Sequence, residues 1–265
     1  MFADDTKIAH PVGTEEDIEN MQKDIDNLHS WAGRWQMRYN ADKCGVMHVG
    51  YHNPHHTYHM GNDTLRVTPE EKDLGVLIHQ SLKVSTQCAA AAKKANRVLG
   101  MIKRSFQYRS REVILKLYKS LVRPHLDYCM QAWCPYLEKD KKTLEKVQAR
   151  ATKLIPNLKD LPYEIRLRRL NLTTLEVRRK RGDLIQAYRI ITQLDNIDPN
   201  SIFQKTIYQG TRGHSQKLAK TRPRLDVRKH FYSQRVVDSW NKLPEDVIQS
   251  QTLLTFKMKL SKLGY

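Results

Sequence analysis

The stretch FADDTKIA at residues 2–9 places two adjacent carboxylates, Asp4 and Asp5, directly ahead of a strand-like segment. Two neighbouring Asp side chains at the tip of a hairpin repel each other unless a cation lies between them. Hard cations such as Mg²⁺ prefer carboxylate oxygens and keep coordination sites free for substrate phosphates. Adjacent Asp residues near a terminus are also common in solvated turns, so the pair by itself is compatible with a metal site or with a plain turn.

Residues 10–82 indicate a small layer in which one helix packs on a sheet. Apolar residues recur at nearly helical spacing between residues 15 and 38, and Thr14 followed by Glu-Glu-Asp is a typical helix start. We expect this helix to bury Ile18, Met21, Ile25, Leu28, Trp31 and Trp35. The strands that would cover it are expected at 6–12, 44–49, 57–60, 65–67 and 74–78.

The pattern becomes helical beyond residue 85. Turn residues between 195 and 230 indicate a looser segment, and helices are expected at 89–106, 110–122, 139–154, 173–194, 232–243 and 252–263. The sequence therefore predicts an α+β chain, in which a small antiparallel sheet with one packed helix precedes a mainly helical region. The expected domains are 1–82, 83–195 and a loosely ordered basic extension at 196–265.

Charge is divided unevenly along the chain. Residues 1–90 contain 8 Lys and Arg against 13 Asp and Glu, a net charge of −5, whereas residues 91–265 contain 38 against 15, a net charge of +23. A segment this basic attracts polyanions, and nucleic acid is the usual partner of such a segment. A solvated basic surface without a partner is the alternative interpretation.

Composition also limits the class of protein. No stretch approaches the roughly 20 apolar residues that a membrane span requires, and the N-terminus does not resemble a secretory leader. The four Cys residues, at positions 44, 88, 129 and 134, do not follow the spacing of a zinc site. We expect a protein that is not secreted and has no membrane partner, located inside the cell in the nucleus, the cytoplasm or both.

Several short stretches, in their order along the chain, resemble the second half of the reverse transcriptase of non-LTR retrotransposons of the jockey and CR1 type. They are FADD at 2–5, NADKC at 40–44, KDLGV at 72–76, RPRLD at 222–226, FYSQRVV at 231–237, WNKLP at 240–244 and TFK at 255–257. The resemblance implies the rear part of a polymerase palm, a helical thumb and a C-terminal extension. It also implies an RNA-directed DNA polymerase, a nucleotidyltransferase that uses Mg²⁺ or Mn²⁺ and has an RNA template and a DNA primer or target as partners.

The resemblance assigns roles to single residues. Asp4 and Asp5 match the metal ligands of the family, where the metal bridges the phosphates of the incoming nucleotide and lowers the pKa of the primer hydroxyl. Lys43 matches a palm lysine that neutralises or protonates the departing pyrophosphate, although an ordinary loop lysine is the simpler interpretation. Gly75 matches the hairpin that resembles the primer grip, where a glycine lets the backbone approach the primer closely.

Basic residues after position 90 are candidates for phosphate contacts. Those selected are Lys93, Lys94, Arg97, Arg178, Arg179, Lys180, Arg181, Arg222, Arg224 and Arg228. The run at 178–181 has three interpretations, namely a nuclear import signal, a nucleic-acid contact and a solvated helix face. Four His residues, at 52, 55, 56 and 59, surround a Pro-containing turn without a Cys partner, so we expect a solvated loop there rather than a zinc site.

The chain departs from the family in one respect. In those elements the Asp-Asp motif lies in mid-domain, after the fingers and after a palm strand that carries a third metal-binding Asp, and this sequence has neither. We therefore expect a fragment that does not polymerise in isolation, because two-metal chemistry needs the third carboxylate. The alternative is a non-catalytic basic protein that binds RNA or DNA and derives from a retroelement.

Overall fold

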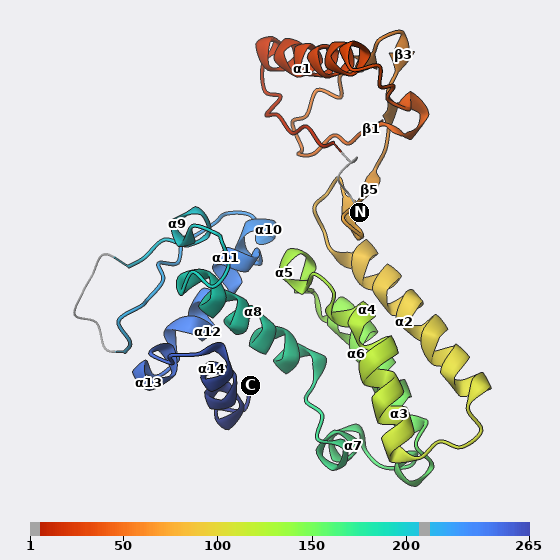
Figure 1. The fold of residues 1–265 in the computed structure, drawn as a ribbon, viewed down its shortest axis with the longest axis vertical. Coiled ribbons are helices and arrows are strands. Elements are labelled where there is room, and N and C mark those ends of the chain that lie inside the picture. The colour runs from red at the N-terminus through yellow and green to blue at the C-terminus, as the bar shows by residue number, and fades with distance from the viewer. Residues whose placement is uncertain (1–5, 207–212) are drawn as a thin grey trace. The chain divides into compact units, whose positions relative to one another are not determined.

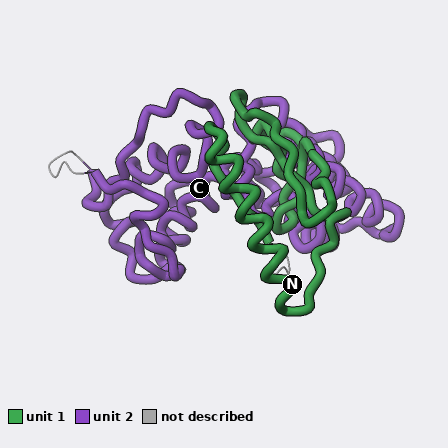
Figure 2. Tube along the Cα trace, turned by 90° about the horizontal axis from the view of Figure 1, so that it is seen from above, with its two compact units in different colours: residues 1–86 green, residues 87–265 purple. Residues whose placement is uncertain are grey.

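The structure, a computed structural model, describes residues 6–206 and 213–265. The chain forms two compact units, Met1–Thr86 (unit 1) and Gln87–Tyr265 (unit 2), coloured green and purple in Figure 2. Unit 1 combines a helix with small two-stranded sheets, and unit 2 is mainly helical, so the chain is mixed α and β. The boundary expected between residues 82 and 83 lies close to the division between the units, and the one expected between 195 and 196 lies inside unit 2.

Unit 1 is built from one long helix and very short strands. Its elements are α1 (Glu15–Arg34), the 3₁₀ turn η1 (Ala41–Lys43), β1 (Gly45–Val46), β2 (His59–Met60), β3 (Asp63–Thr64), β4 (Arg66–Val67), β5 (Glu70–Asp73) and β6 (Val76–His79). β1 pairs with β4 in parallel, whereas β2–β3 and β5–β6 are antiparallel hairpins. The structure thus has three separate two-stranded sheets where one antiparallel sheet was expected, and residues 6–12 form no strand. Gly, Pro, Asn and His residues between positions 50 and 63 interrupt the apolar alternation that longer strands would need.

Helix α1 begins where its sequence predicts and packs through part of the predicted apolar face. The Thr14 hydroxyl accepts a hydrogen bond from the Asp17 amide at 3.2 Å, and the Asp17 carboxylate accepts one from the Thr14 amide at 2.9 Å, which completes a capping box. Ile25 is buried against Tyr58 and neighbouring apolar residues of the strand region. Helix and strand are also joined through polar atoms, because the Gln22 side-chain amide bonds to both the backbone N–H and the backbone oxygen of His59.

The two Trp residues of α1 do not enter this core. Trp31 is 43% exposed and Trp35 is 67% exposed, so the expectation that both are core residues is wrong. Helix geometry gives the reason, because 3.6 residues per turn place Trp35 roughly 80° and Trp31 roughly 120° from the line of Ile25. The short strands cover the Ile25 line and leave that flank open.

The β5–β6 hairpin contains the KDLGV stretch and turns through Leu74 and Gly75. Asp73 pairs with Val76, which leaves a two-residue loop whose φ angles are 45° at Leu74 and 85° at Gly75. Positive φ at both positions is typical of a type I′ turn, in which glycine is comfortable and leucine is strained. Gly75 therefore has a structural role in the hairpin, whatever else it contacts.

We expect Leu74→Asn to stabilise this hairpin by about 0.5–1 kcal/mol, because Asn tolerates the left-handed region that Leu avoids. Gly75→Ala is the opposite case and should weaken the hairpin by about 1 kcal/mol. Hydrogen exchange of the β5 and β6 amides measures both changes. Faster exchange in the Asn variant than in the parent chain would contradict the turn assignment.

The front part of unit 2 is a set of packed helices (Figure 1). Its elements are α2 (Ser85–Ser105), which starts at the unit boundary, α3 (Arg111–Leu117), the π turn η2 (Tyr118–Val122), α4 (Pro124–Asp127), α5 (Met130–Trp133), α6 (Glu138–Lys153), η3 (Pro156–Leu158), α7 (Tyr163–Leu170) and α8 (Leu175–Ile191). The helix expected at 110–122 is interrupted by η2, and α4 follows with Pro124 in its first turn, where a missing N–H is tolerated. Helix α7 was not expected from the sequence.

The rear part of unit 2 consists of short helices around one core. They are α9 (Pro199–Ile202), α10 (Asp226–Lys229), α11 (Tyr232–Arg235), α12 (Val237–Asn241), α13 (Glu245–Ile248) and α14 (Leu253–Lys262). Trp240 and Phe256, both fully buried, pack with the second half of α8 in this core. Phe203 and Leu218, which lie in the segment expected to be loose, are buried in the same core. The stretches FYSQRVV, WNKLP and TFK thus contribute to one folded core.

Candidate nucleic-acid interface

Helix α2 separates an apolar face from a basic face. Its buried residues include the alanines at 91, 92 and 95 together with Leu99 and Ile102, whereas Lys93, Lys94 and Arg97 are exposed. Arg104, one of the helix's further basic residues, is also exposed and lies two turns after Arg97. We call Lys93, Lys94, Arg97 and Arg104 the α2 stripe. At 1.5 Å per residue it extends over about 16 Å of helix.

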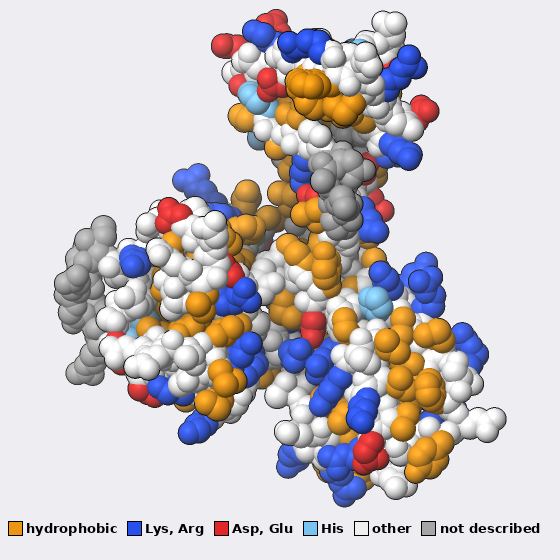
Figure 3. All heavy atoms as spheres, viewed as in Figure 1, with side chains coloured by type: hydrophobic (Ala, Val, Ile, Leu, Met, Phe, Trp, Pro, Cys, Tyr) orange, Lys and Arg blue, Asp and Glu red, His pale blue; other side chains and the backbone are white. Residues whose placement is uncertain are grey.

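The α2 stripe carries charge that the protein itself does not neutralise. Helix α2 contains five Lys and Arg and no Asp or Glu. None of the four stripe residues forms an ion pair with any residue that the structure describes. On the face drawn in Figure 3, blue Lys and Arg side chains gather over the helical part of unit 2 with few red carboxylates between them. Such a surface is suited to a phosphate backbone.

Neighbouring helices add to the stripe. His125 of α4 lies near Lys94 and Arg97: burial lowers the pKa of its imidazole, and the two positive charges lower it further. Arg150 of α6 donates a hydrogen bond to the Asn96 side chain at 3.1 Å, which holds a further cation beside α2. Arg104, His125 and Arg150 are therefore candidate contacts that the sequence pattern alone did not select. Their charge was visible in the sequence, but their position beside α2 depends on how the helices pack.

The basic run at 178–181 does not form one surface, because helical rotation sends its four side chains in different directions. Arg178 forms an ion pair with Asp127 at 2.5 Å, and Arg181 donates to the backbone oxygens of Lys257 and Tyr265 at 2.9 and 2.8 Å. Lys180 is exposed and pairs with Glu176 at 3.2 Å. Arg179 is buried. Arg178 and Arg181 hold separate parts of the fold together, whereas the Lys180 pair is an exposed contact within α8. We therefore do not include the run in the interface.

The basic residues near the C-terminus are exposed. Arg222, Arg224 and Arg228 all face solvent before or within α10. The Arg228 guanidinium lies 5.4 Å from the centre of the Phe231 ring, and this ring is 47% exposed. An exposed aromatic ring beside a cation can stack on a base while the cation contacts phosphate. Arg228 and Phe231 thus form a second candidate contact within unit 2.

The residues that the resemblance assigns to catalysis are only partly visible. Asp4 and Asp5 lie outside the described residues. Lys43 ends the η1 turn and is exposed. Lys7 lies 2.6 Å from the Asp73 carboxylate, so the segment that follows the Asp pair contacts the hairpin that contains Gly75.

Metal ligands are not gathered in the described part of the chain. No group of three or more His, Cys, Asp or Glu side chains there is arranged to hold a metal ion. His48 and His55 form an edge-to-face ring contact with their centres 4.9 Å apart, and His52 contacts Tyr51 in the same way. Binding of Mg²⁺ or Mn²⁺ by Asp4 and Asp5 therefore stays a prediction of the resemblance.

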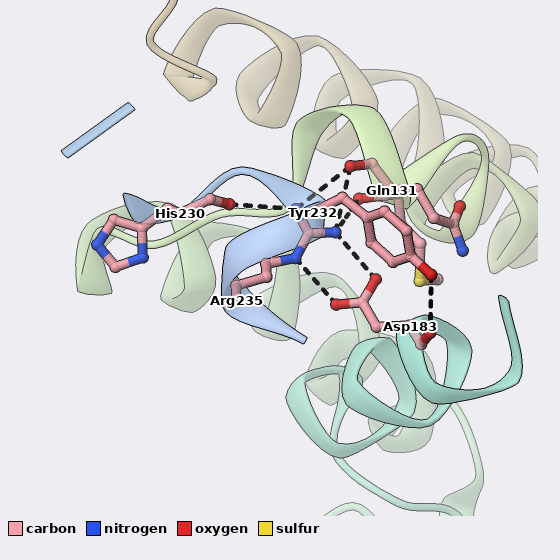
Figure 4. Close-up of polar contacts among 6 residues, drawn as sticks. Gln131, Asp183, His230, Tyr232 and Arg235 are labelled. Atoms are coloured by element: carbon pink, nitrogen blue, oxygen red, sulfur yellow. Dashed lines mark hydrogen bonds and ion pairs between the residues drawn. The ribbon is translucent and has the colours of Figure 1, made fainter. Parts of the chain in front are cut away.

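One buried ion pair organises the rear of unit 2 and was not predicted. The Arg235 guanidinium bonds to both carboxylate oxygens of Asp183 at 2.9 Å, and it also donates to backbone oxygens of Met130, Gln131 and His230 at 3.2 Å (Figure 4). Burial raises the pKa of the Asp183 carboxyl, and the bonds from Arg235 oppose this rise. Arg235 lies in the FYSQRVV stretch, so this part of the stretch has a structural explanation.

A second buried network orients the front of unit 2. Gln148 of α6 accepts a hydrogen bond from the Tyr118 hydroxyl at 2.6 Å and donates to the backbone oxygen of Thr173 at 3.0 Å. The Glu145 carboxylate accepts a hydrogen bond from the Leu175 amide at 3.0 Å, at the start of α8. A carboxylate at this position satisfies a free N–H and interacts favourably with the helix dipole. These residues fix how α6 meets α8 and have no apparent role in binding.

Comparisons with known proteins leave the family open. None of the helices in residues 6–206 and 213–265 is both long and apolar enough to cross a membrane. A scan against models of protein families, a search of curated proteins and a search of solved structures found no match to this chain.

Proposed function

We propose that this chain is the rear palm and thumb region of a non-LTR reverse transcriptase and that it binds RNA or DNA through unit 2. The observation that carries the proposal is the α2 stripe, a row of exposed cations on a helix without a carboxylate, none of which pairs with an acidic residue in the described part of the chain. A phosphate backbone neutralises such a row with release of counterions, which gives affinity without sequence preference.

The reverse transcriptase assignment depends on the resemblance of the short stretches. In favour of it, unit 1 carries a net charge of −5 and unit 2 a net charge of +23, since residues 87–90 are uncharged. This division suits a metal-binding palm ahead of a thumb that holds template and primer. The contact between Lys7 and Asp73 also brings the neighbourhood of the Asp pair to the primer-grip-like hairpin. The second candidate is a non-catalytic nucleic-acid-binding protein, which the α2 stripe supports equally.

Neutralising the α2 stripe should weaken binding to every nucleic acid. We expect the full chain with Lys93→Gln, Lys94→Gln, Arg97→Gln and Arg104→Gln to bind single-stranded RNA and duplex DNA about tenfold or more weakly at 0.1 M salt. The slope of log affinity against log salt should become shallower by about 3, because each lost phosphate contact removes roughly 0.7–0.9. Fluorescence anisotropy over a range of KCl concentrations measures both quantities.

A matched control removes the same charge from unit 1. Lys23, Arg34, Arg38 and Lys83 are exposed, and none forms an ion pair with a described residue, so their change to Gln alters net charge without touching α2. We expect this control to keep most of the parent affinity and the parent salt slope. Equal losses in the two variants would show that net charge alone, rather than the α2 stripe, drives binding.

A further inference from the structure

Arg179 lies in the interior of unit 2 with an unsatisfied guanidinium. The residue belongs to α8 and is 3% exposed, and its Nη1 and Nη2 atoms have no hydrogen-bond partner among the residues that the structure describes. A buried charge in this state is costly, because it has lost its water without gaining an internal partner. Both atoms are also covered by neighbouring groups, so an anion can reach them only if the side chains around them move.

The acidic residues nearest in α8 are engaged elsewhere. Asp183, one turn after Arg179, has both carboxylate oxygens bonded to Arg235 at 2.9 Å. Glu176, one turn before, lies 3.2 Å from the Lys180 ammonium and 3.7 Å from the Lys141 ammonium. Neither carboxylate forms an ion pair with Arg179. The Arg179 charge favours the ionised form of both carboxylates, so they supply part of its counter-charge without bonding to the guanidinium.

A cavity of about 160 Å³ opens beside Arg179, entirely within unit 2. It lies between the segment after α5, the first half of α8 and the segment from α10 to α12. Four cations and two carboxylates line it, a formal net charge of +2; they are Lys141, Arg179, Lys180 and Arg235 against Glu176 and Asp183. Tyr136 and His230 form one wall and stack face to face, with ring centres 4.5 Å apart.

We propose that this cavity binds a phosphate monoester group. A net charge of +2 matches a phosphate dianion, and a guanidinium fork flanked by two ammonium groups is the donor set that phosphate prefers. The volume is below the roughly 300–1,000 Å³ typical of sites for whole small molecules, so the cavity takes a single group rather than a nucleotide. The source is either inorganic phosphate or the 5′-terminal phosphate of a polynucleotide. This site is separate from the α2 stripe, which would contact the internal phosphates of a backbone.

The lysines give the ligand a route to Arg179. The Lys141 and Lys180 side chains are 25% and 54% exposed, and both pair with Glu176. Lys141 also has a closer partner, the Glu138 carboxylate at 2.8 Å. A phosphate that enters the cavity draws these ammonium groups away from the Glu176 carboxylate and contacts the guanidinium behind them. Glu176 is therefore a competitor of the ligand, and its removal should strengthen binding.

The first test is Arg179→Met in the full chain, with inorganic phosphate as the probe and chloride of equal ionic strength as the reference. We expect phosphate to raise the midpoint of thermal unfolding of the parent chain, and the variant to bind phosphate about 10- to 100-fold more weakly in calorimetric titration. Without phosphate, the variant should unfold at the same or a higher temperature, because an apolar side chain replaces an unpaired buried charge. A destabilised or unfolded variant would show that Arg179 has a structural partner and would overturn the proposal.

The second test is Glu176→Gln, which keeps the shape of the side chain and removes its charge. We expect this variant to bind phosphate several-fold more tightly than the parent chain. Glu164→Gln is the matched control, since Glu164 is an exposed carboxylate on α7 that does not line the cavity. Weaker binding by the Glu176 variant, or no difference between phosphate and chloride in the parent chain, would refute the site.

Oligonucleotides identify the source of the phosphate. If the ligand is a terminal phosphate, a 5′-phosphorylated strand binds more tightly than the 5′-hydroxyl strand of the same sequence, and Arg179→Met removes that difference. If the ligand is free phosphate, the two strands bind equally while the thermal response to phosphate persists. The four-residue α2 variant should weaken both strands alike and leave the phosphate response intact, so a failure of the proposed nucleic-acid interface is distinguishable from a failure of this site.

Discussion

Asp183→Ala is expected to lower the free energy of unfolding of unit 2 by about 3–5 kcal/mol, because it leaves the Arg235 guanidinium buried without its carboxylate. The Asp183 side chain is 8% exposed and the Arg235 side chain is 14% exposed. Arg235 also donates to backbone oxygens of α5 and of the segment before α11. Loss of the carboxylate therefore affects the whole junction. Urea unfolding followed by the helical circular dichroism signal measures the change.

Two further variants separate this effect from a general loss of charge. Asp238→Ala breaks the ion pair between Asp238, whose side chain is 61% exposed, and Lys220, whose side chain is 43% exposed. It should lower the free energy of unfolding by no more than about 1 kcal/mol. Replacing both partners, with Asp183→Leu and Arg235→Met, should recover part of the stability, because the Arg235 guanidinium is no longer left buried without its carboxylate. Similar losses for Asp183→Ala and Asp238→Ala would contradict the burial argument.

Trp240→Ala is expected to destabilise unit 2 by about 3–5 kcal/mol. The side chain is fully buried, its indole N–H donates to the Gln216 backbone oxygen at 2.8 Å, and its ring lies 6.3 Å from the Phe256 ring. The substitution thus creates a cavity and leaves one buried carbonyl oxygen without its partner. The same urea titration reports the loss.

Trp35→Ala is the matched control, because it removes the same side chain from a surface position. Trp35 is 67% exposed, so its loss should change the free energy of unfolding by less than about 0.5 kcal/mol. A large effect at Trp35 would indicate that the exposed flank of α1 is covered in solution. A small effect at Trp240 would contradict the core described for the rear of unit 2.

Local pattern was sufficient where an element is stabilised by its own residues. The cap at Thr14 placed the start of α1 to the residue, although the helix ends at Arg34 and not at residue 38, and α6 and α14 were anticipated from their periodic apolar residues. The near-helical spacing did not distinguish Trp31 and Trp35 from the core residues, because a residue on the flank of a helix differs from a core residue only in its angle around the helix axis. The predicted strands were too long because the short apolar pairs in unit 1 are followed at once by turn residues.

Long-range partners could not be inferred in this way. Asp183 and Arg235 are 52 residues apart, and nothing in the neighbourhood of either residue indicates the other. The run at 178–181 looks like one basic patch in the sequence, yet a rotation of about 100° per residue gives each side chain a different environment. For α2 the opposite holds, because a helix without any carboxylate carries charge of one sign only, whichever of its turns are exposed. The candidate interface was therefore predicted in part, and the cavity beside Arg179 was not.

Helix α8 belongs to both halves of unit 2, which limits how the chain can be shortened. Its first half packs on α5 and α6, and its second half packs on α12 and α14. A chain that ends near residue 195 would keep α8 but expose Leu184, Ala187 and Tyr188, which are now in the rear core. An apolar surface of this kind promotes aggregation. Truncated variants of this protein should therefore keep α8 and all the residues that follow it. The basic front helices are not suited to study as an isolated fragment.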